Sequence, residues 1–175
     1  MKLDWYKKIV LVGFMGSGKS LIGSALAQKL NIPFLDLDHA IEEKEGKSVQ
    51  TIFAEFGEPY FRALETKYLT ECLALPYQII LSTGGGTPCF SNNIQLIQQA
   101  SQSIFLNVSP EMLFKRLILE KEKRPLIRDL QDDKLLEFIE NKLHERLPYY
   151  QKSTIELEIA DEEDVEKILR RILDF

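Results

Sequence analysis

The sequence predicts a single α/β domain built around a parallel sheet. Short apolar runs alternate along the 175 residues with longer segments whose apolar positions recur at helical spacing, which is the pattern of repeated βαβ units. With 45% hydrophobic and 28% charged residues, the chain can bury one ordinary core and is short for two. No repeat, low-complexity tract or linker interrupts the pattern. We therefore expect one domain over residues 1–175.

The first strand and helix are the clearest of the predicted elements. Residues 9–12 form an apolar, largely β-branched run that ends at Gly13, as expected for a buried strand. The apolar residues that follow share one helical face, namely Leu21, Ile22, Ala25, Leu26 and Leu30. The chain therefore opens with a strand that leads directly into a helix.

Four further strands are predicted. The second covers residues 32–37, with Pro33 near its start, where the missing N–H is least harmful. The third and fourth cover residues 78–82 and 103–108. Residues 154–159 alternate apolar and polar side chains, which is typical of an edge strand.

The C-terminal third contains a predicted loop and a predicted scaffold helix. Residues 121–133 are charged with few apolar anchors, and Pro125 does not suit a continuous helix, so we expect a mobile loop. The last helix is predicted to open at Asp161 as its N-cap. Its apolar face has positions i, i+3, i+4 and i+7, at Val165, Ile168, Leu169 and Ile172.

The composition restricts the classes of partner and location. The 22 Lys and Arg residues against 27 Asp and Glu give a net charge of −5, which disfavours nucleic-acid and polybasic membrane binding. No apolar run approaches the roughly 18 residues that span a bilayer, and the N-terminus lacks a signal-peptide stretch. Cys72 and Cys89 are too few and too isolated for a zinc site or a disulfide framework. We expect a cytoplasmic monomer.

Residues 13–20, Gly-Phe-Met-Gly-Ser-Gly-Lys-Ser, match the phosphate-loop pattern G-x-x-x-x-G-K-[ST]. They lie between a predicted strand and a predicted helix, which is the context that the pattern requires. Glycines let the backbone curl so that N–H groups point at phosphate oxygens, and the helix N-terminus adds a positive dipole end. Lys19 is expected to reach the β- and γ-phosphates, and Ser20 to offer its hydroxyl to Mg²⁺.

A phosphate loop does not by itself identify the reaction. The D-x-x-G signal of a GTPase does not occur, and His144 stands where the guanine-reading Asp of N-K-x-D belongs. The third predicted strand ends in Ser82 rather than a carboxylate, while Asp36 and Asp38 lie at the end of the second. Two apart on a strand, these carboxylates should share one face at the ligand-binding edge of the sheet. Capping of the next helix is an alternative role for Asp38.

Six motifs occur in order along nearly the whole chain. They are residues 13–20, Asp36-Leu37-Asp38, Phe61-Arg62-Ala63-Leu64-Glu65, Gly84-Gly85-Gly86, Arg124-Pro125-Leu126 and Arg146-Leu147-Pro148-Tyr149-Tyr150. In this order and spacing the sequence resembles the shikimate kinase family of nucleoside monophosphate kinase-like P-loop enzymes. The resemblance implies a three-layer αβα P-loop fold with a five-stranded parallel sheet in the order 2-3-1-4-5. It also implies transfer of the ATP γ-phosphoryl group to the 3-hydroxyl of shikimate with Mg²⁺, a step of aromatic amino acid biosynthesis.

The resemblance assigns roles to particular residues of a shikimate-binding region, about 38–65, and a lid, about 121–133. Catalytic roles go to Lys19, Asp38 and Arg124. Shikimate binding goes to Asp38, Phe61, Arg62, Gly84, Gly85, Gly86 and Arg146. ATP binding goes to Gly16, Ser17, Gly18, Lys19, Ser20, Leu21, Arg116 and Arg124. Metal binding goes to Ser20 and, through water, to Asp36.

The chemistry of shikimate, a carboxylate with three hydroxyls, agrees with these roles. A planar guanidinium grips a carboxylate bidentately, which suits Arg62 and Arg146, although surface ion pairs are an alternative reading. The three glycines favour close backbone approach to a ligand. A lid that delivers Arg124 would support charge on the moving phosphoryl group and exclude water, whereas a solvated charged loop is the alternative.

The departures from the family pattern concern the base end of the nucleotide site. Leu21 follows the phosphate-loop Ser where Thr is usual, and Leu117 stands at the place of an adenine-covering Arg, with Arg116 one position away. Residues 160–164 lack the usual Pro. The alternatives are a gluconate or nucleoside monophosphate kinase of the same fold, or a nucleotide-binding protein without activity.

Overall fold

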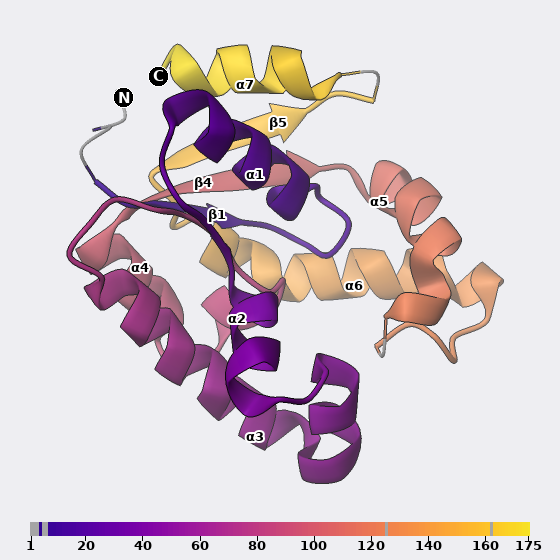
Figure 1. The fold of residues 1–175 in the computed structure, drawn as a ribbon. Helices are drawn as coiled ribbons and strands as arrows, with labels where there is room; N and C mark the ends of the chain where they lie inside the picture. Colours follow the sequence, from indigo (N-terminus) through magenta and orange to yellow (C-terminus); the bar gives the residue numbers. More distant parts are fainter. Residues whose placement is uncertain (1–3, 5–6, 125, 162) are drawn as a thin grey trace.

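The computed structural model describes residues 4, 7–124, 126–161 and 163–175. Five parallel strands form one sheet in the order β2-β3-β1-β4-β5. Their bounds are Ile9–Val12 (β1), Phe34–Asp36 (β2), Ile80–Ser82 (β3), Gln102–Val108 (β4) and Ile155–Ile159 (β5). Figure 1 shows helices on both sides of the sheet. The predicted αβα architecture and strand order are therefore confirmed.

The helices divide between the two faces of the sheet. Their bounds are Lys19–Leu30 (α1), Leu37–Glu45 (α2), Val49–Ala74 (α3), Asn93–Ala100 (α4), Pro110–Leu117 (α5), Asp132–Tyr150 (α6) and Val165–Leu173 (α7), with 3₁₀ helices at Thr87–Cys89 (η1) and Ile118–Lys123 (η2). Helices α1 and α7 cover one face, and α3, α4 and α6 lie on the other (Figure 1). Among the described helices, none has the length and apolarity needed to cross a membrane.

The strand order decides which loops meet at the carboxyl edge of the sheet. Strand β1 is fully buried and lies between β3 and β4, so the loop that follows it emerges at the centre of that edge. Asp36 ends β2 directly opposite Ser82, which ends β3. Strand β5 pairs with β4 and alternates buried and exposed residues, as predicted for an edge strand. Three strand ends therefore converge next to residues 13–20.

Helix α3 contains a kink at Gly57. Gly57 interrupts it with a left-handed φ of 78° and ψ of 172°, and Pro59 follows within the second segment. A left-handed φ is readily adopted only by glycine. The bend brings Phe53 before the kink and Phe61 after it into ring contact, with centroids 4.7 Å apart.

Three details differ from the predicted elements. The last helix begins at Val165 with Asp164 as N-cap, because its carboxylate accepts from the N–H of Lys167 at 2.8 Å; the prediction of Asp161 was wrong, and that residue pairs with Lys115. The second strand ends at Asp36, and helix α2 begins at Leu37.

The third difference concerns the predicted lid. Residues 121–133 are not one irregular loop, because η2 extends to Lys123 and α6 begins at Asp132. Pro125, which contributed to that prediction, lies outside the described residues, as does Glu162 of the segment 160–164. The mobility of the lid stays a prediction.

Candidate active site

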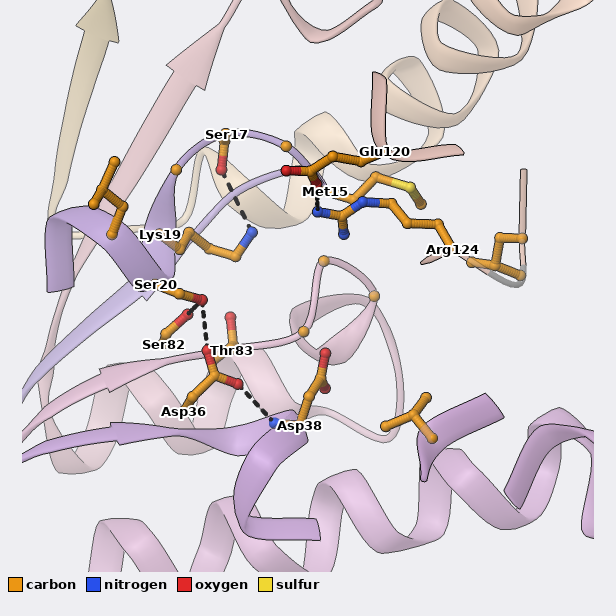
Figure 2. A pocket seen from close by; sticks show the side chains of 18 of the residues that line it. Met15, Ser17, Lys19, Ser20, Asp36, Asp38, Ser82, Thr83, Glu120 and Arg124 are labelled. Carbon is orange, nitrogen blue, oxygen red and sulfur yellow. Dashed lines mark hydrogen bonds and ion pairs between the residues drawn. The ribbon is translucent and has the colours of Figure 1, made fainter. Parts of the chain in front are cut away.

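A cavity of about 800 Å³ opens at the carboxyl ends of β1, β2 and β3. Every site residue predicted from the sequence lies in its wall: Gly16, Ser17, Gly18, Lys19, Ser20, Leu21, Asp36, Asp38, Phe61, Arg62, Gly84, Gly85, Gly86, Arg116, Arg124 and Arg146. Figure 2 shows Lys19, Ser20, Asp36 and Asp38 gathered beneath the phosphate loop, with Arg124 and Glu120 on the opposite side. The tertiary fold brings together segments that lie more than a hundred residues apart in sequence.

The phosphate loop, residues 13–20, has the backbone that its glycines allow. Gly13, Gly16 and Gly18 adopt φ values of 148°, 79° and 92°, a region that side chains with a Cβ rarely enter. Gly18 is the N-cap of α1, so the first N–H groups of the helix face the loop. The curled loop and the helix end together form a cradle for an anion.

Lys19 points back into the phosphate loop. Its ammonium donates to the carbonyls of Gly13 at 2.9 Å and Phe14 at 2.8 Å, and lies 3.4 Å from the Ser17 hydroxyl. Burial lowers the pKa of Lys19 to about 8, a shift that the negative charges of Asp38 and Asp36 oppose. The ammonium is therefore a buried cation held by neutral oxygens beside the phosphate cradle.

Three oxygen-bearing side chains meet next to Lys19. The Ser20 hydroxyl donates to Asp36 Oδ2 at 2.5 Å and lies 3.3 Å from the Ser82 hydroxyl. Asp36 Oδ1 accepts from the backbone N–H groups of Asp38 and His39, so Asp36 is the N-cap of α2. Hydroxyl and carboxylate oxygens are the ligands that Mg²⁺ prefers. The donor set at this point fits a hard divalent cation.

The position of Asp38 corrects two sequence-based expectations. The residue lies in the first turn of α2 rather than on a strand, and Asp36, not Asp38, caps that helix. Asp36 therefore reaches the cavity from the end of β2, and Asp38 reaches it from the first turn of α2, which follows directly. Asp38 Oδ1 is buried and accepts no hydrogen bond from any described residue. Burial first, then the charges of Glu65 and Asp36, raise the pKa of Asp38 to about 7.

Arg62 is buried on α3 and held by two carboxylates of the same helix. Its Nη1 donates to Glu65 at 2.6 Å, while Nε and Nη2 donate to Glu58 at 3.0 and 2.7 Å. Burial opposes the charge of Arg62, but Glu65 and Glu58 outweigh that cost and its pKa lies above the ordinary value. The alternative of a surface ion pair is wrong for Arg62, because its side chain is only 9% exposed and that of Glu65 1%.

Residues 84–86, the glycine loop, run between β3 and η1 in close contact with other parts of the site. A Cβ on Gly84 would lie 2.7 Å from Glu65 Oε1 and 3.0 Å from Asp38 Oδ1. On Gly86 it would lie 2.6 Å from the Arg62 guanidinium. None of the three glycines has a positive φ, so the space around them, rather than backbone strain, excludes a side chain. The sequence predicts that these glycines let a ligand come close to the backbone. The structure shows that side chains of the protein itself come close to them.

Arg146 reaches the cavity from α6. It is 8% exposed and lies over the Phe14 ring of the phosphate loop, 5.4 Å from the centroid. A Cβ on Gly85 would lie 3.5 Å from its Nη1 and 3.0 Å from the N of Met15. No carboxylate of the described residues forms an ion pair with Arg146, so here too the surface-pair alternative is wrong.

The base and lid side of the cavity carries two further arginines. Arg116 donates to the carbonyl of Gly16 at 3.1 Å. Arg124 donates from Nη2 to Glu120 at 2.8 Å, and its Nε is buried without a partner among the described residues. Leu21 is 63% exposed and lines the cavity. Its place on the apolar core face of the helix was therefore wrongly predicted, whereas its assignment to the nucleotide side of the site stays a prediction.

Sequence reasoning missed the partners of the predicted residues. Glu65 stood within a quoted motif without a role, although its spacing of three residues from Arg62 on a helix is a signal for contact. Glu120, four residues before Arg124, carries the same kind of signal. The contact between Tyr150 and Gly85 has no such signal, since 65 residues separate them.

The comparisons with known proteins agree with this geometry. A family model described as shikimate kinase matches residues 15–175. A shikimate kinase of Bacteroides thetaiotaomicron is 40% identical over 168 residues, covering 94% of this chain and 95% of the relative. The chain belongs to the shikimate kinase family. A shikimate kinase of Flavobacterium psychrophilum is 42% identical over 170 residues, covering 95% of this chain and 99% of the relative.

Solved structures of the shikimate kinase family share the fold. The crystal structure of the Bacteroides thetaiotaomicron enzyme superposes with a TM-score of 0.89 at 40% identity, covering 96% of this chain and 97% of that chain. That of Acinetobacter baumannii, a complex with shikimate, has a TM-score of 0.87 at 31% identity and covers 96% and 91%. A gluconokinase of Sinorhizobium meliloti, 17% identical with a TM-score of 0.60, shows the fold alone. The predicted family and kinase activity are confirmed.

Proposed function

We propose that the chain transfers the γ-phosphoryl group of ATP to the 3-hydroxyl of shikimate. The observation that carries this proposal is the unpartnered, buried carboxylate oxygen of Asp38, which shares one cavity with Lys19 and with two buried arginines. A carboxylate beside a hydroxyl acceptor, and cations beside a carboxylate and a phosphate, are the groups this reaction needs. The related structure that contains shikimate supports the choice of acceptor.

The phosphate loop would hold ATP with Lys19 on the β- and γ-phosphates. The ammonium then exchanges the carbonyls of Gly13 and Phe14 for charged phosphate oxygens, which are stronger acceptors. Arg124 would turn from Glu120 towards the γ-phosphoryl group and stabilise the charge that it carries in the transition state. Arg116 and Leu21 would border the base, where the chain departs from the family pattern.

Asp38 would act as the base for the acceptor hydroxyl. The bond between the shikimate 3-oxygen and the γ-phosphorus forms while the bond to the β,γ-bridging oxygen breaks, and the hydroxyl proton passes to Asp38. A pKa of about 7 leaves a substantial ionised fraction and a useful proton affinity at neutral pH. The charge of Lys19 opposes this rise in the pKa of Asp38, whereas Glu65, Asp36 and Glu42 contribute to it.

Arg62 and Arg146 would hold the shikimate carboxylate from α3 and α6, with Phe61 as an apolar wall and residues 84–86 as the floor. Glu58 is the partner that shikimate would displace, because its side chain is 48% exposed while Glu65 is buried behind Arg62. The arginine then exchanges one carboxylate for another, which keeps its charge paired.

Ser20, and Asp36 through water, would hold Mg²⁺ in this reaction. The cluster of Ser20, Asp36 and Ser82 oxygens supports the assignment. A magnesium ion bound with ATP neutralises charge on the β- and γ-phosphates. The cytoplasmic location and monomeric state inferred from the sequence stay predictions.

A coupled assay of ADP release tests the proposal. Shikimate, gluconate, AMP and CMP are offered as acceptors at equal concentration with Mg-ATP, and Lys19→Met serves as the background control. We expect the highest kcat/KM with shikimate and only background rates with the others. A higher kcat/KM with gluconate or AMP would contradict the proposed acceptor while leaving the phosphate loop in place.

A further inference from the structure

We infer that Tyr150 is a positioning residue that orients the glycine loop for the acceptor. Tyr150 is the last residue of α6 and is completely buried. Its hydroxyl donates a hydrogen bond to the carbonyl of Gly85, in the centre of residues 84–86. This inference rests on the proposed function, because it concerns the acceptor half of that site.

Tyr150 approaches the glycine loop from outside the wall of the cavity. Gly85, Gly86 and Arg146 line the cavity, whereas Tyr150 does not. The described chain contains no cis peptide, and in a trans peptide the carbonyl and the following N–H point in opposite directions. Anchoring the Gly85 carbonyl on Tyr150 therefore directs the Gly86 N–H towards the cavity.

The need for an anchor follows from the loop itself. Three successive glycines have the largest backbone freedom to lose, and the peptide between Gly85 and Gly86 could otherwise rotate. Gly85 lies close to the phosphate loop and to Arg146, because an added Cβ would lie 3.0 Å from the N of Met15 and 3.5 Å from Arg146 Nη1. A rotation at Gly85 would disturb the contact between the phosphate and acceptor halves.

Tyr150 is itself held rigidly enough for this role. Its ring lies against Phe105 of β4, with centroids 5.1 Å apart. Burial raises the pKa of its phenol, so the hydroxyl remains a donor throughout the working pH range. Arg146 lies one helical turn earlier on the same face of α6. One helix therefore carries both an acceptor-side cation and the anchor of the loop beside it.

Tyr150→Phe tests the inference, because it keeps the ring and removes the hydroxyl, which bonds the Gly85 carbonyl and also interacts with Arg146. Loss of one neutral hydrogen bond predicts a rise of roughly 3- to 10-fold in KM for shikimate. The KM for ATP should change less than twofold, because residues 13–20 keep their own contacts. Tyr149→Phe is the matched control, since no described residue hydrogen-bonds to its hydroxyl, and should match the wild type. An unchanged KM for shikimate in Tyr150→Phe would overturn the inference.

A second variant separates positioning from simple stability. Phe105→Leu weakens the ring contact but leaves the Tyr150 hydroxyl in place, so Tm should fall while the KM for shikimate changes little. If Phe105→Leu raises that KM as much as Tyr150→Phe at equal loss of Tm, the role is structural only and the inference is wrong.

A measurement on the wild type covers the case in which Tyr150→Phe does not fold. Titration of ¹⁵N-labelled protein with shikimate should shift the amide resonance of Gly86, and an unshifted amide would overturn the inference. The same wild-type sample reports turnover of shikimate. Failure of the proposed function would appear as a wild type that does not phosphorylate shikimate, and failure of the inference alone as an active wild type with unchanged variants.

Discussion

The phosphate half and the acceptor half of the cavity are built in different ways. The phosphate half comes from one uninterrupted segment, residues 13–20, and its cradle consists of backbone held by three glycines with positive φ. The acceptor half is assembled from α2, α3, the glycine loop and α6. Its recognition groups are charged side chains, and Arg62 is oriented by two carboxylates of its own helix.

This difference has consequences for how each half responds to change. Backbone groups do not depend on the identity of distant side chains, so the phosphate half is robust wherever its glycines are kept. The acceptor half relies on buried charges, and removing one partner of a buried pair costs about 3–5 kcal/mol. The same dependence lets side chains define which acceptor fits. The backbone of residues 13–20 therefore binds the phosphate donor, and the side chains of the acceptor half determine which acceptor fits.

The largest effect is expected in the phosphate half. Lys19→Met should reduce kcat by about 10³-fold or more, because a buried cation beside the phosphates is lost from the transition state. Stability should change little, since Lys19 binds neutral carbonyls. Lys29→Met, the same change on an exposed position of α1, is the control. A normal kcat in Lys19→Met would remove the phosphate loop from the mechanism.

Asp38→Asn should lower kcat by about 10²- to 10⁴-fold if Asp38 is the base. It also changes the pH profile. Asp38 must be ionised, and its pKa is raised to about 7, so wild-type kcat/KM should rise as the pH increases through 7. Lys19 must be protonated, and its pKa is lowered to about 8, so kcat/KM should fall above that value.

The rising and falling limbs of the pH profile belong to Asp38 and Lys19, whose charges interact. The apparent pKa values therefore describe the pair rather than either residue alone. In Asp38→Asn the rising limb should disappear while the falling limb remains. Asp174→Asn, an exposed carboxylate in the last residues of the chain, should keep the wild-type profile. A rising limb near pH 7 that persists in Asp38→Asn would assign the base to another residue.

A smaller effect is expected from Arg62→Lys, which tests the side-chain character of the acceptor half. The charge is kept but the planar fork is lost, so KM for shikimate should rise about tenfold, or about 1.4 kcal/mol. The KM for ATP should be unchanged. Arg170→Lys, whose side chain is 74% exposed on α7, is the control. Equal increases in both KM values would mean that the two halves are not separable as described.

The last prediction concerns the lid, where the effect is on motion rather than on catalysis. Amide hydrogen exchange in residues 118–124 and 126–133 should slow by about tenfold when a non-hydrolysable ATP analogue and shikimate are both present. The physical reason is the transfer of Arg124 from Glu120 to the phosphates. Exchange in α4, none of whose residues lines the cavity, is the internal control. Unchanged exchange in the lid would favour the solvated-loop alternative.

The two halves also differ in how far the sequence predicts them. Residues 13–20 are contiguous, and the glycine pattern follows from backbone sterics alone, so this half could be read from the sequence in detail. The strand before the loop was predicted at its observed bounds, Ile9–Val12, and the predicted helix after it occurs as Lys19–Leu30. For the acceptor half, the sequence indicated the residues through the order of its motifs, but not their contacts.

What the sequence determined by itself is the set of local preferences: an α/β alternation, a phosphate loop, and a list of charged residues at the right points along the chain. Only the tertiary structure decided that Asp36 rather than Asp38 caps α2 and that Tyr150 binds Gly85. The physical reason is that dihedral preferences and spacing act within a few residues. Contacts between remote side chains, and the burial that raises the pKa of Asp38, arise only when the strand order brings separate segments to one edge of the sheet.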